Sequence, residues 1–124
     1  MVIETASGGK FRFKVEMAET MAQQAQGLMF RRQMAADAGM LFPYAAPQVA
    51  AFWMKNTFIP LDMVFIAADG RITHIHPNAT PQSEASISSK GPVKAVLEIN
   101  GGLAARLSIR VGDLARHALF GNAS

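Results

Sequence analysis

The sequence contains no cysteine, which excludes disulfide bridges, thiolate zinc sites and cysteine nucleophiles. It also lacks any continuous apolar run of the ~20 residues that a transmembrane helix needs, so we expect no transmembrane segment. Residues 1–5 have neither the basic region nor the apolar region of a signal peptide. These absences leave the compartment open and remove several classes of site.

A strong excess of charge of one sign is also missing. Twelve basic and nine acidic residues give a net charge of +3, and the basic residues are scattered, with Arg31-Arg32 as the one adjacent pair. A nucleic-acid-binding protein usually concentrates its basic residues on one face, among aromatic residues. We therefore expect no nucleic-acid partner.

The known short signatures of nucleophiles and phosphate loops are absent as well. The chain has no Gly-x-Ser-x-Gly, no His-Glu-x-x-His and no Gly-x-x-x-x-Gly-Lys-Ser/Thr. No cofactor is indicated by any motif. The sequence gives no positive ground for assigning an enzyme activity, and we lean against one.

What is present is the composition of a folded protein. Half of the 124 residues are apolar and 17% are charged, which excludes disorder, since disordered chains combine low hydrophobicity with high net charge. The length fits one domain. We expect a single domain over residues 1–124, with an ordered core from about residue 10 to residue 119.

In the first half, residues 10–17 alternate between polar and apolar side chains, which predicts a strand with one wet face. Thr20 and Gln23 fit a capping box, so a short helix is predicted over residues 21–26 and Gly27 can end it. Short strands are predicted at 2–5, 39–42 and 50–54, with residues 44–49 as a loop.

In the second half, Asp69-Gly70 predicts a tight hairpin turn between strands at 61–67 and 71–76. Residues 77–91 are rich in Ser, Pro, Asn and Thr and are predicted to form one long surface loop. A strand at 93–99, a short helix at 103–107 and a last strand at 114–119 follow. Short strands with frequent turns favour an antiparallel sheet. The predicted fold class is α+β: a sheet-rich, mainly antiparallel small barrel or strongly curved sheet of about seven short strands with two short helices.

The clearest candidate site is the run from Phe52 to Asp62, which places polar side chains in an apolar stretch. Polar groups in such surroundings must be paired or exposed for a reason. We predict a pocket for a small polar or carbohydrate-like ligand, because an exposed tryptophan beside charged and amide groups suits such ligands. Its predicted residues are Trp53, Lys55, Asn56, Asp62, Glu98 and Arg31. The alternative is that the two carboxylates lie on a wet face or form framework ion pairs with Lys55, Arg31 or Arg32.

His74 and His76 are two residues apart on a predicted strand, so they point to the same face and are weak candidates for metal ligands. A third ligand is not evident, with Asp62 and His117 as the options, and we predict no metal site. The same residues define an alternative function, a small hydrolase with Asp62 or Glu98 as general base and His74 or His76 as acid or metal ligand.

Several sequence blocks together resemble a known family. They are Gly27-Leu28-Met29-Phe30-Arg31, Gly39-Met40-Leu41-Phe42, Phe52-Trp53-Met54-Lys55-Asn56-Thr57, Ile59-Pro60-Leu61-Asp62, Asp69-Gly70, Val96-Leu97-Glu98-Ile99 and Gly112-Asp113. In this order the chain resembles domain of unknown function family 192, a bacterial and archaeal family, from about Phe11 to Leu119. One departure is Gln23-Gln24, where many relatives have a Glu-Arg pair, so an ion pair at that helix is not essential to the fold.

The resemblance implies a compact, sheet-rich domain that is often carried behind a signal peptide or lipoprotein-type leader. It implies no activity. We therefore favour an exported, periplasmic protein whose leader is absent from this chain, with a cytoplasmic protein as the alternative. The first functional hypothesis is a non-catalytic binding module, followed by a structural or protein-interaction module of the cell envelope and then by the hydrolase. The oligomeric state stays open.

Overall fold

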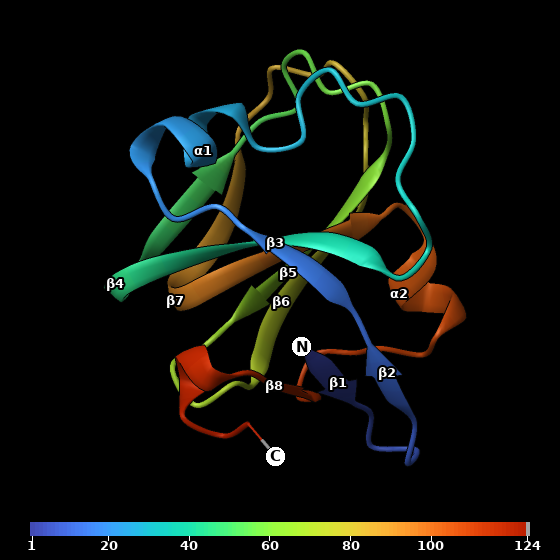
Figure 1. The fold of residues 1–124 in the computed structure, drawn as a ribbon, viewed down its shortest axis with the longest axis vertical. Coiled ribbons are helices and arrows are strands. Elements are labelled where there is room, and N and C mark those ends of the chain that lie inside the picture. The colour runs from blue at the N-terminus through green and yellow to red at the C-terminus, as the bar shows by residue number, and fades with distance from the viewer. Residues whose placement is uncertain (124) are drawn as a thin grey trace.

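The computed structural model describes residues 1–123 and contains eight strands in two sheets. The smaller sheet has the order β2-β1-β8 and the larger has the order β3-β4-β7-β5-β6 (Figure 1). The strands are β1 (Val2–Glu4), β2 (Lys10–Arg12), β3 (Lys14–Met17), β4 (Ala38–Phe52), β5 (Leu61–Ile66), β6 (Ile72–Ala79), β7 (Ile87–Asn100) and β8 (Leu114–Arg116). The helices are α1 (Met21–Gln26), α2 (Leu103–Arg106) and the single 3₁₀ turn η1 (Ala118–Phe120).

The predicted sheet-rich α+β class with two short α-helices is confirmed, but a closed barrel is not. The strands within residues 1–123 form two separate sheets. All strand pairs are antiparallel except β3 with β4, which run parallel. No helix in this part of the chain is both long and apolar enough to cross a membrane.

The strands differ most from the predicted short ones at β4 and β7, which have 15 and 14 residues. β4 continues through the predicted loop at 44–49. β6 extends to Ala79 and β7 begins at Ile87, so the predicted loop over 77–91 shrinks to residues 80–86. These polar and proline-containing stretches stay in the sheet because irregular pairing accommodates them.

The predicted strand over residues 10–17 is also divided in the structure. Phe13 is buried between β2, which joins the smaller sheet, and β3, which joins the larger one. Its amide donates to the carbonyl of Met1 at 2.9 Å. The alternation in this segment is therefore real, but its two halves serve different sheets.

Predictions that rest on local signals are confirmed. Thr20 is the N-cap of α1, and its side chain and that of Gln23 make the reciprocal hydrogen bonds of a capping box. Gly27 follows the helix with a φ of 48°. The hairpin around Asp69-Gly70 joins β5 and β6, and the second helix begins at Leu103 as predicted.

The larger sheet has an apolar core on each face, which explains why β5 is buried along its whole length. One face, with Val64 and Leu97, packs against the smaller sheet, α2 and η1. The other face, with Met63 and Phe65, is covered by Leu28, Met54 and the curled ends of β4 and β7. We call them the helix face and the pocket face.

Candidate functional site

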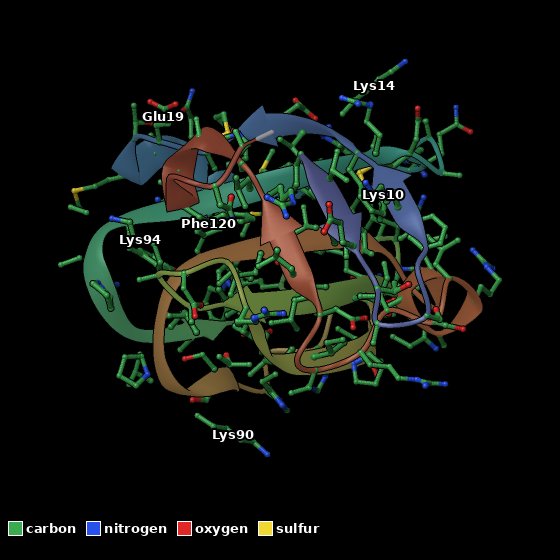
Figure 2. The ribbon with its side chains drawn as sticks, turned by 90° about the horizontal axis from the view of Figure 1, so that it is seen from below. Lys10, Lys14, Glu19, Lys90, Lys94 and Phe120 are labelled. Carbon is green, nitrogen blue, oxygen red and sulfur yellow. The ribbon has the colours of Figure 1, made fainter. Side chains whose placement is uncertain are left out.

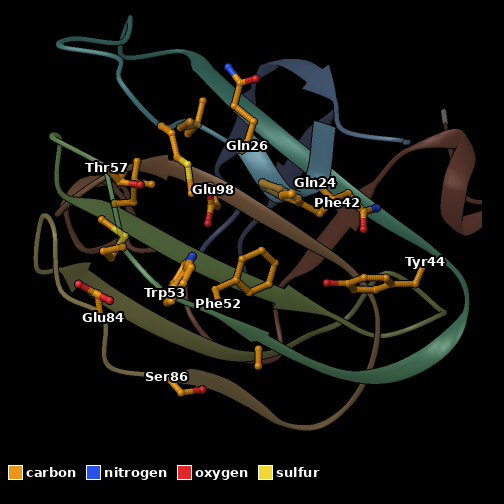
Figure 3. A pocket seen from close by; sticks show the side chains of 17 residues that line it. Gln24, Gln26, Phe42, Tyr44, Phe52, Trp53, Thr57, Glu84, Ser86 and Glu98 are labelled. Atoms are coloured by element: carbon orange, nitrogen blue, oxygen red, sulfur yellow. The ribbon is translucent and has the colours of Figure 1, made fainter. Parts of the chain in front are cut away.

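A cavity of about 460 Å³ opens on the pocket face. This volume lies within the range of small-molecule sites. Its lining comes from four regions of the chain: residues 24–29 around the end of α1, β4 with the residues that follow it, the 80–86 connection, and single positions on β5 and β7 (Figure 3). Segments distant in sequence therefore build one concave surface.

An irregularity in β4 shapes one wall of this cavity. Between Pro43 and Gln48 the register against β7 shifts, so that residues 44–47 bulge out opposite Lys94. The ammonium group of Lys94 donates to the carbonyl of Ala45 at 2.9 Å and holds the bulge. Bulges bend a strand and redirect side chains, and here Tyr44, at the start of the bulge, lines the cavity.

The end of α1 is attached directly to this wall. The side-chain amide of Gln24 donates to the carbonyls of Ala18 and Pro43, both at 3.0 Å. A Cβ atom placed on Gly27 would lie 3.3 Å from the ring of Phe42, so the glycine allows the chain to approach the aromatic side chain closely. A six-residue helix is not stable alone, and these contacts hold it at the mouth of the cavity.

Glu98 is the buried ionisable group of the cavity. Its side chain is on the pocket face, and the residue is 4% exposed. No group within residues 1–123 donates a hydrogen bond to its carboxyl, whereas every fully buried side-chain nitrogen or oxygen in this part has a partner. The Glu98 oxygens must therefore open on the cavity itself. Burial raises the pKa of Glu98 to about 8, so the group is mostly protonated at neutral pH.

Tyr44 stands near this acid. Burial and the charge of Glu98 raise the pKa of the Tyr44 phenol to about 12, so its hydroxyl stays protonated. In Figure 3 the hydroxyl points into the cavity. A carboxylic acid and a phenol, both protonated at neutral pH, therefore face the cavity among apolar and aromatic walls.

The structure places two of the six predicted site residues in the cavity and the other four outside it. Trp53 and Glu98 line the cavity, whereas Lys55, Asn56, Asp62 and Arg31 do not. Trp53 is 47% exposed, and the Lys55 ammonium lies 5.1 Å from the centre of its ring. Asn56 occupies a turn with a φ of 56°, and its carbonyl accepts a hydrogen bond from the amide of Phe30 at 2.9 Å.

Asp62 lies on the helix face. Asp62 pairs with Ile99 and its neighbour Met63 pairs with Glu98, so the two carboxylates point to opposite sides of the sheet. The fully buried Asp62 carboxylate accepts hydrogen bonds from the amides of Asn78 at 2.8 Å and of Gly102 and Ala104 at 2.9 Å each. It caps α2 in place of a side chain on Gly102.

Arg31 is engaged elsewhere, in a two-pronged ion pair with Glu16 of β3, with one of the two contacts at 2.9 Å. The hydrogen bond from Arg31 lowers the pKa of Glu16 and raises that of Arg31. Because both side chains are substantially exposed, this pair belongs to the surface. It is not part of the cavity.

His74 and His76 both lie on β6, outside the cavity lining. The His74 ring stacks on Phe65 with centroids 5.6 Å apart, and burial together with Lys90 and His76 lowers the pKa of His74. Within residues 1–123 there is no cluster of three or more His, Asp or Glu side chains suited to a metal. Asp62 and Glu98, on opposite faces, also leave no point within hydrogen-bond reach of both.

Several cavity residues were not among the predicted ones. The aromatic walls come from Phe42, Tyr44 and Phe52, and polar groups come from Gln24, Thr57 and Glu84. One signal pointed to Phe42, Phe52 and Thr57, which lie in the family blocks at 39–42 and 52–57, whereas Tyr44, Gln24 and Glu84 lie in none of the blocks. The blocks are far apart in the sequence, so their convergence is visible only in the fold.

The chain is a small α+β protein in which a five-stranded sheet carries a pocket on one face. The chain belongs to the family described as "Uncharacterized ACR", domain of unknown function 192, whose profile matches residues 2–117. The family resemblance inferred from the sequence blocks is therefore confirmed.

Two solved structures are similar to this chain. A protein of Sinorhizobium meliloti 1021, described as a candidate transcription regulator, is 50% identical with a TM-score of 0.93, over 95% of this chain and 92% of that one. A protein of unknown function from Novosphingobium aromaticivorans DSM 12444 is 48% identical with a TM-score of 0.88, over 91% and 80%. A comparison with curated proteins gave no match.

Proposed function

We propose that this protein is a non-catalytic binding module for a small polar or carbohydrate-like ligand, which enters the cavity beside Trp53. The observation that carries the proposal is the buried Glu98 carboxyl, which opens without a partner on a cavity of about 460 Å³. A buried polar group without a hydrogen bond costs stability. Such a cost is expected where a ligand supplies the missing partner.

The composition of the walls supports the same reading. Phe42, Tyr44, Phe52 and Trp53 offer flat apolar surface, and few polar groups are placed among them. Binding sites for small molecules combine mostly apolar walls with a small number of converging polar groups. Of the predicted residues, Trp53 and Glu98 have the strongest support as ligand contacts, whereas Lys55 remains a contact at the margin through its position over Trp53.

Three other functions have less support. The hydrolase with Asp62 or Glu98 as general base and His74 or His76 as acid or metal ligand has less support, because Asp62 is engaged by three backbone amides and neither histidine lines the cavity that holds Glu98. A direct role on nucleic acid, which the description of the Sinorhizobium protein could suggest, would need a basic surface; the labelled lysines instead point outward on different sides of the molecule (Figure 2). An interaction module is not favoured by any single observation on the described residues.

The proposal is tested by thermal unfolding in the presence of a panel of sugars, organic acids, nucleotides and amines. A ligand at a hundred times its Kd adds about 2.7 kcal/mol to the stability. We expect at least one member to raise the Tm of the wild-type chain.

A pair of matched variants assigns the binding to the cavity. Ala25 and Ala22 are both exposed on α1, but only Ala25 lines the cavity. We expect Ala25→Trp to abolish the shift by filling the space and Ala22→Trp to retain it. A stabilising ligand that binds both variants equally would contradict the cavity as its site, and a panel without any stabilising compound would contradict the proposed function.

A further inference from the structure

Every ionisable side chain that lines the cavity is an acid, which is either neutral or negatively charged. Glu84 and Glu98 are carboxyl groups, Tyr44 is a phenol, and no lysine, arginine or histidine takes part in the lining. The helix packed over the cavity, α1, has the sequence MAQQAQ and contributes no charge. Lys55 lies over the ring of Trp53, and Lys94 donates to the carbonyl of Ala45 in the bulge, but both are outside the lining. An anionic ligand would therefore find no partner of opposite charge inside.

The aromatic side chains are arranged around the same space. Phe42 and Phe52 meet edge to face with centroids 5.2 Å apart, and Tyr44 and Trp53 extend the wall on either side. Aromatic rings attract cations to their faces, and cages of such rings recognise quaternary ammonium groups. The Lys55 ammonium at 5.1 Å from the Trp53 ring is an example of this attraction within the chain.

Glu98 supplies an independent observation. The residue is 4% exposed, its carboxyl has no hydrogen-bond partner among residues 1–123, and its oxygens open on the cavity. No cation within the described chain lowers the pKa of this group, since burial alone accounts for its rise. A buried carboxylate is normally paired with a positive charge. No residue of the lining supplies that charge, so Glu98 is mostly protonated in the free protein, and a cationic ligand would provide the partner of its ionised form.

From the aromatic walls, the acidic lining and the unpartnered Glu98 carboxyl, we infer that the ligand carries a cationic head group, an alkylamine or quaternary ammonium. This inference rests on the proposed function and narrows its polar ligand to an organic cation. A carbohydrate or another neutral ligand would use the same walls and would leave Glu98 protonated.

Binding of a cation would also change the protonation of Glu98. A cation beside Glu98 favours the ionised carboxylate, so the protonated carboxyl of the free protein gives its proton to the solvent when the cation binds. Glu84 is exposed and Tyr44 keeps its proton, since its pKa is about 12. The affinity for the cation should rise with pH up to about 8, the pKa of Glu98 in the free protein, and level off above it.

The test compares ligands of the same shape and different charge. Isothermal titration of the full chain with choline and with its uncharged analogue 3,3-dimethyl-1-butanol separates charge from shape; tetramethylammonium, butylamine and glucose complete the set. We expect at least one of the three cations to bind, and choline to bind at least tenfold more tightly than the neutral analogue. Titrations at pH 6.5 in two buffers of different ionisation enthalpy should show release of close to one proton.

Two variants of cavity residues are tested, so that misfolding of one of them does not decide the result. Glu98→Gln should reduce the preference for choline over its analogue to less than threefold and remove the proton release. Trp53→Leu, at a half-exposed position, should weaken the binding of choline more than the binding of the analogue.

The possible failures are distinguishable. Equal binding of choline and its analogue, or tighter binding of glucose, overturns the cationic head group and leaves the binding module intact. If none of the three cations binds while another ligand of the panel binds in the cavity, the cationic head group is likewise overturned and the binding module is kept. If no compound binds, both the cationic head group and the binding module are overturned.

Discussion

Asp62 and Glu98 are two buried carboxyl groups on neighbouring strands, and they have opposite environments. Asp62 accepts three backbone hydrogen bonds on the helix face. Glu98 accepts none on the pocket face and opens on a cavity. The comparison teaches that burial alone does not separate framework from function. The two groups differ in whether the protein itself supplies hydrogen-bond partners: it does so for Asp62 and not for Glu98.

The largest effect is expected for the satisfied carboxylate. Asp62→Ala leaves the amides of Asn78, Gly102 and Ala104 without their acceptor, and an unpaired buried donor costs about 1–3 kcal/mol. We expect a loss of roughly 3 kcal/mol or more in the free energy of unfolding, measured by urea denaturation with Trp53 fluorescence.

Asp62→Asn serves as the graded control, since it keeps one acceptor oxygen and the shape of the side chain. It should lose less than the alanine variant. If Asp62→Ala costs under about 1 kcal/mol, the capping of α2 is not the role of this residue and the contrast with Glu98 disappears.

An intermediate effect with a distinctive pH dependence is expected for Glu98. The folded pKa of about 8 lies above the ordinary carboxyl value of 4.5, so between these pH values the folded state holds a proton that the unfolded state has lost. The stability that this group contributes is complete below about pH 4.5 and is lost as the pH rises to about 8.

Glu98→Gln removes this titration. We expect the variant to be more stable than the wild type above pH 8, and its free energy of unfolding to lack the wild-type decline between pH 5 and 8. Urea denaturation at a series of pH values measures both curves. Parallel curves would mean that Glu98 does not hold a proton in the folded state.

The smallest effect is expected for a carboxylate that is exposed and paired. Arg31 lowers the pKa of Glu16, so the sign is opposite to that of Glu98: the stability from this pair is present above pH 4.5 and is lost as the pH falls. Surface ion pairs contribute at most about 1 kcal/mol. Glu16→Gln should therefore change the urea midpoint only slightly, and 0.5 M salt should reduce the difference further. A large, salt-independent loss would show that the pair is structural.

The parts of this fold that could be predicted from the sequence depend on neighbouring residues. The capping box of Thr20 and Gln23 and the Asp69-Gly70 turn need only local geometry, and both are confirmed. The predicted loops at 44–49 and 77–91 were wrong over much of their length, because bulges accommodate the polar and proline residues within long strands. Pairing with a partner strand, which a local pattern does not contain, decided those segments.

The candidate site, like the fold, could be predicted from the sequence only in part. Trp53 and Glu98 could be singled out as unusual residues in apolar stretches, and both line the cavity. The partners of Asp62 are 16, 40 and 42 residues away, so its role as a cap for α2 depends on the completed fold. The face on which Glu98 lies also follows from register, since a shift by one residue would place it with Asp62.

The pairing of β1 with β8 has a consequence for how this protein is made. Arg116 donates to the carboxylate of Glu4 at 2.8 Å across a separation of 112 residues, and Ile3 lies opposite Ala115 in the core of the helix face. During synthesis β1 can pair with β2 early, but its pairing with β8 must wait until residues 114–116 have emerged from the ribosome. Until then the apolar helix face of the larger sheet stays uncovered, and incomplete chains that end before β8 are expected to aggregate.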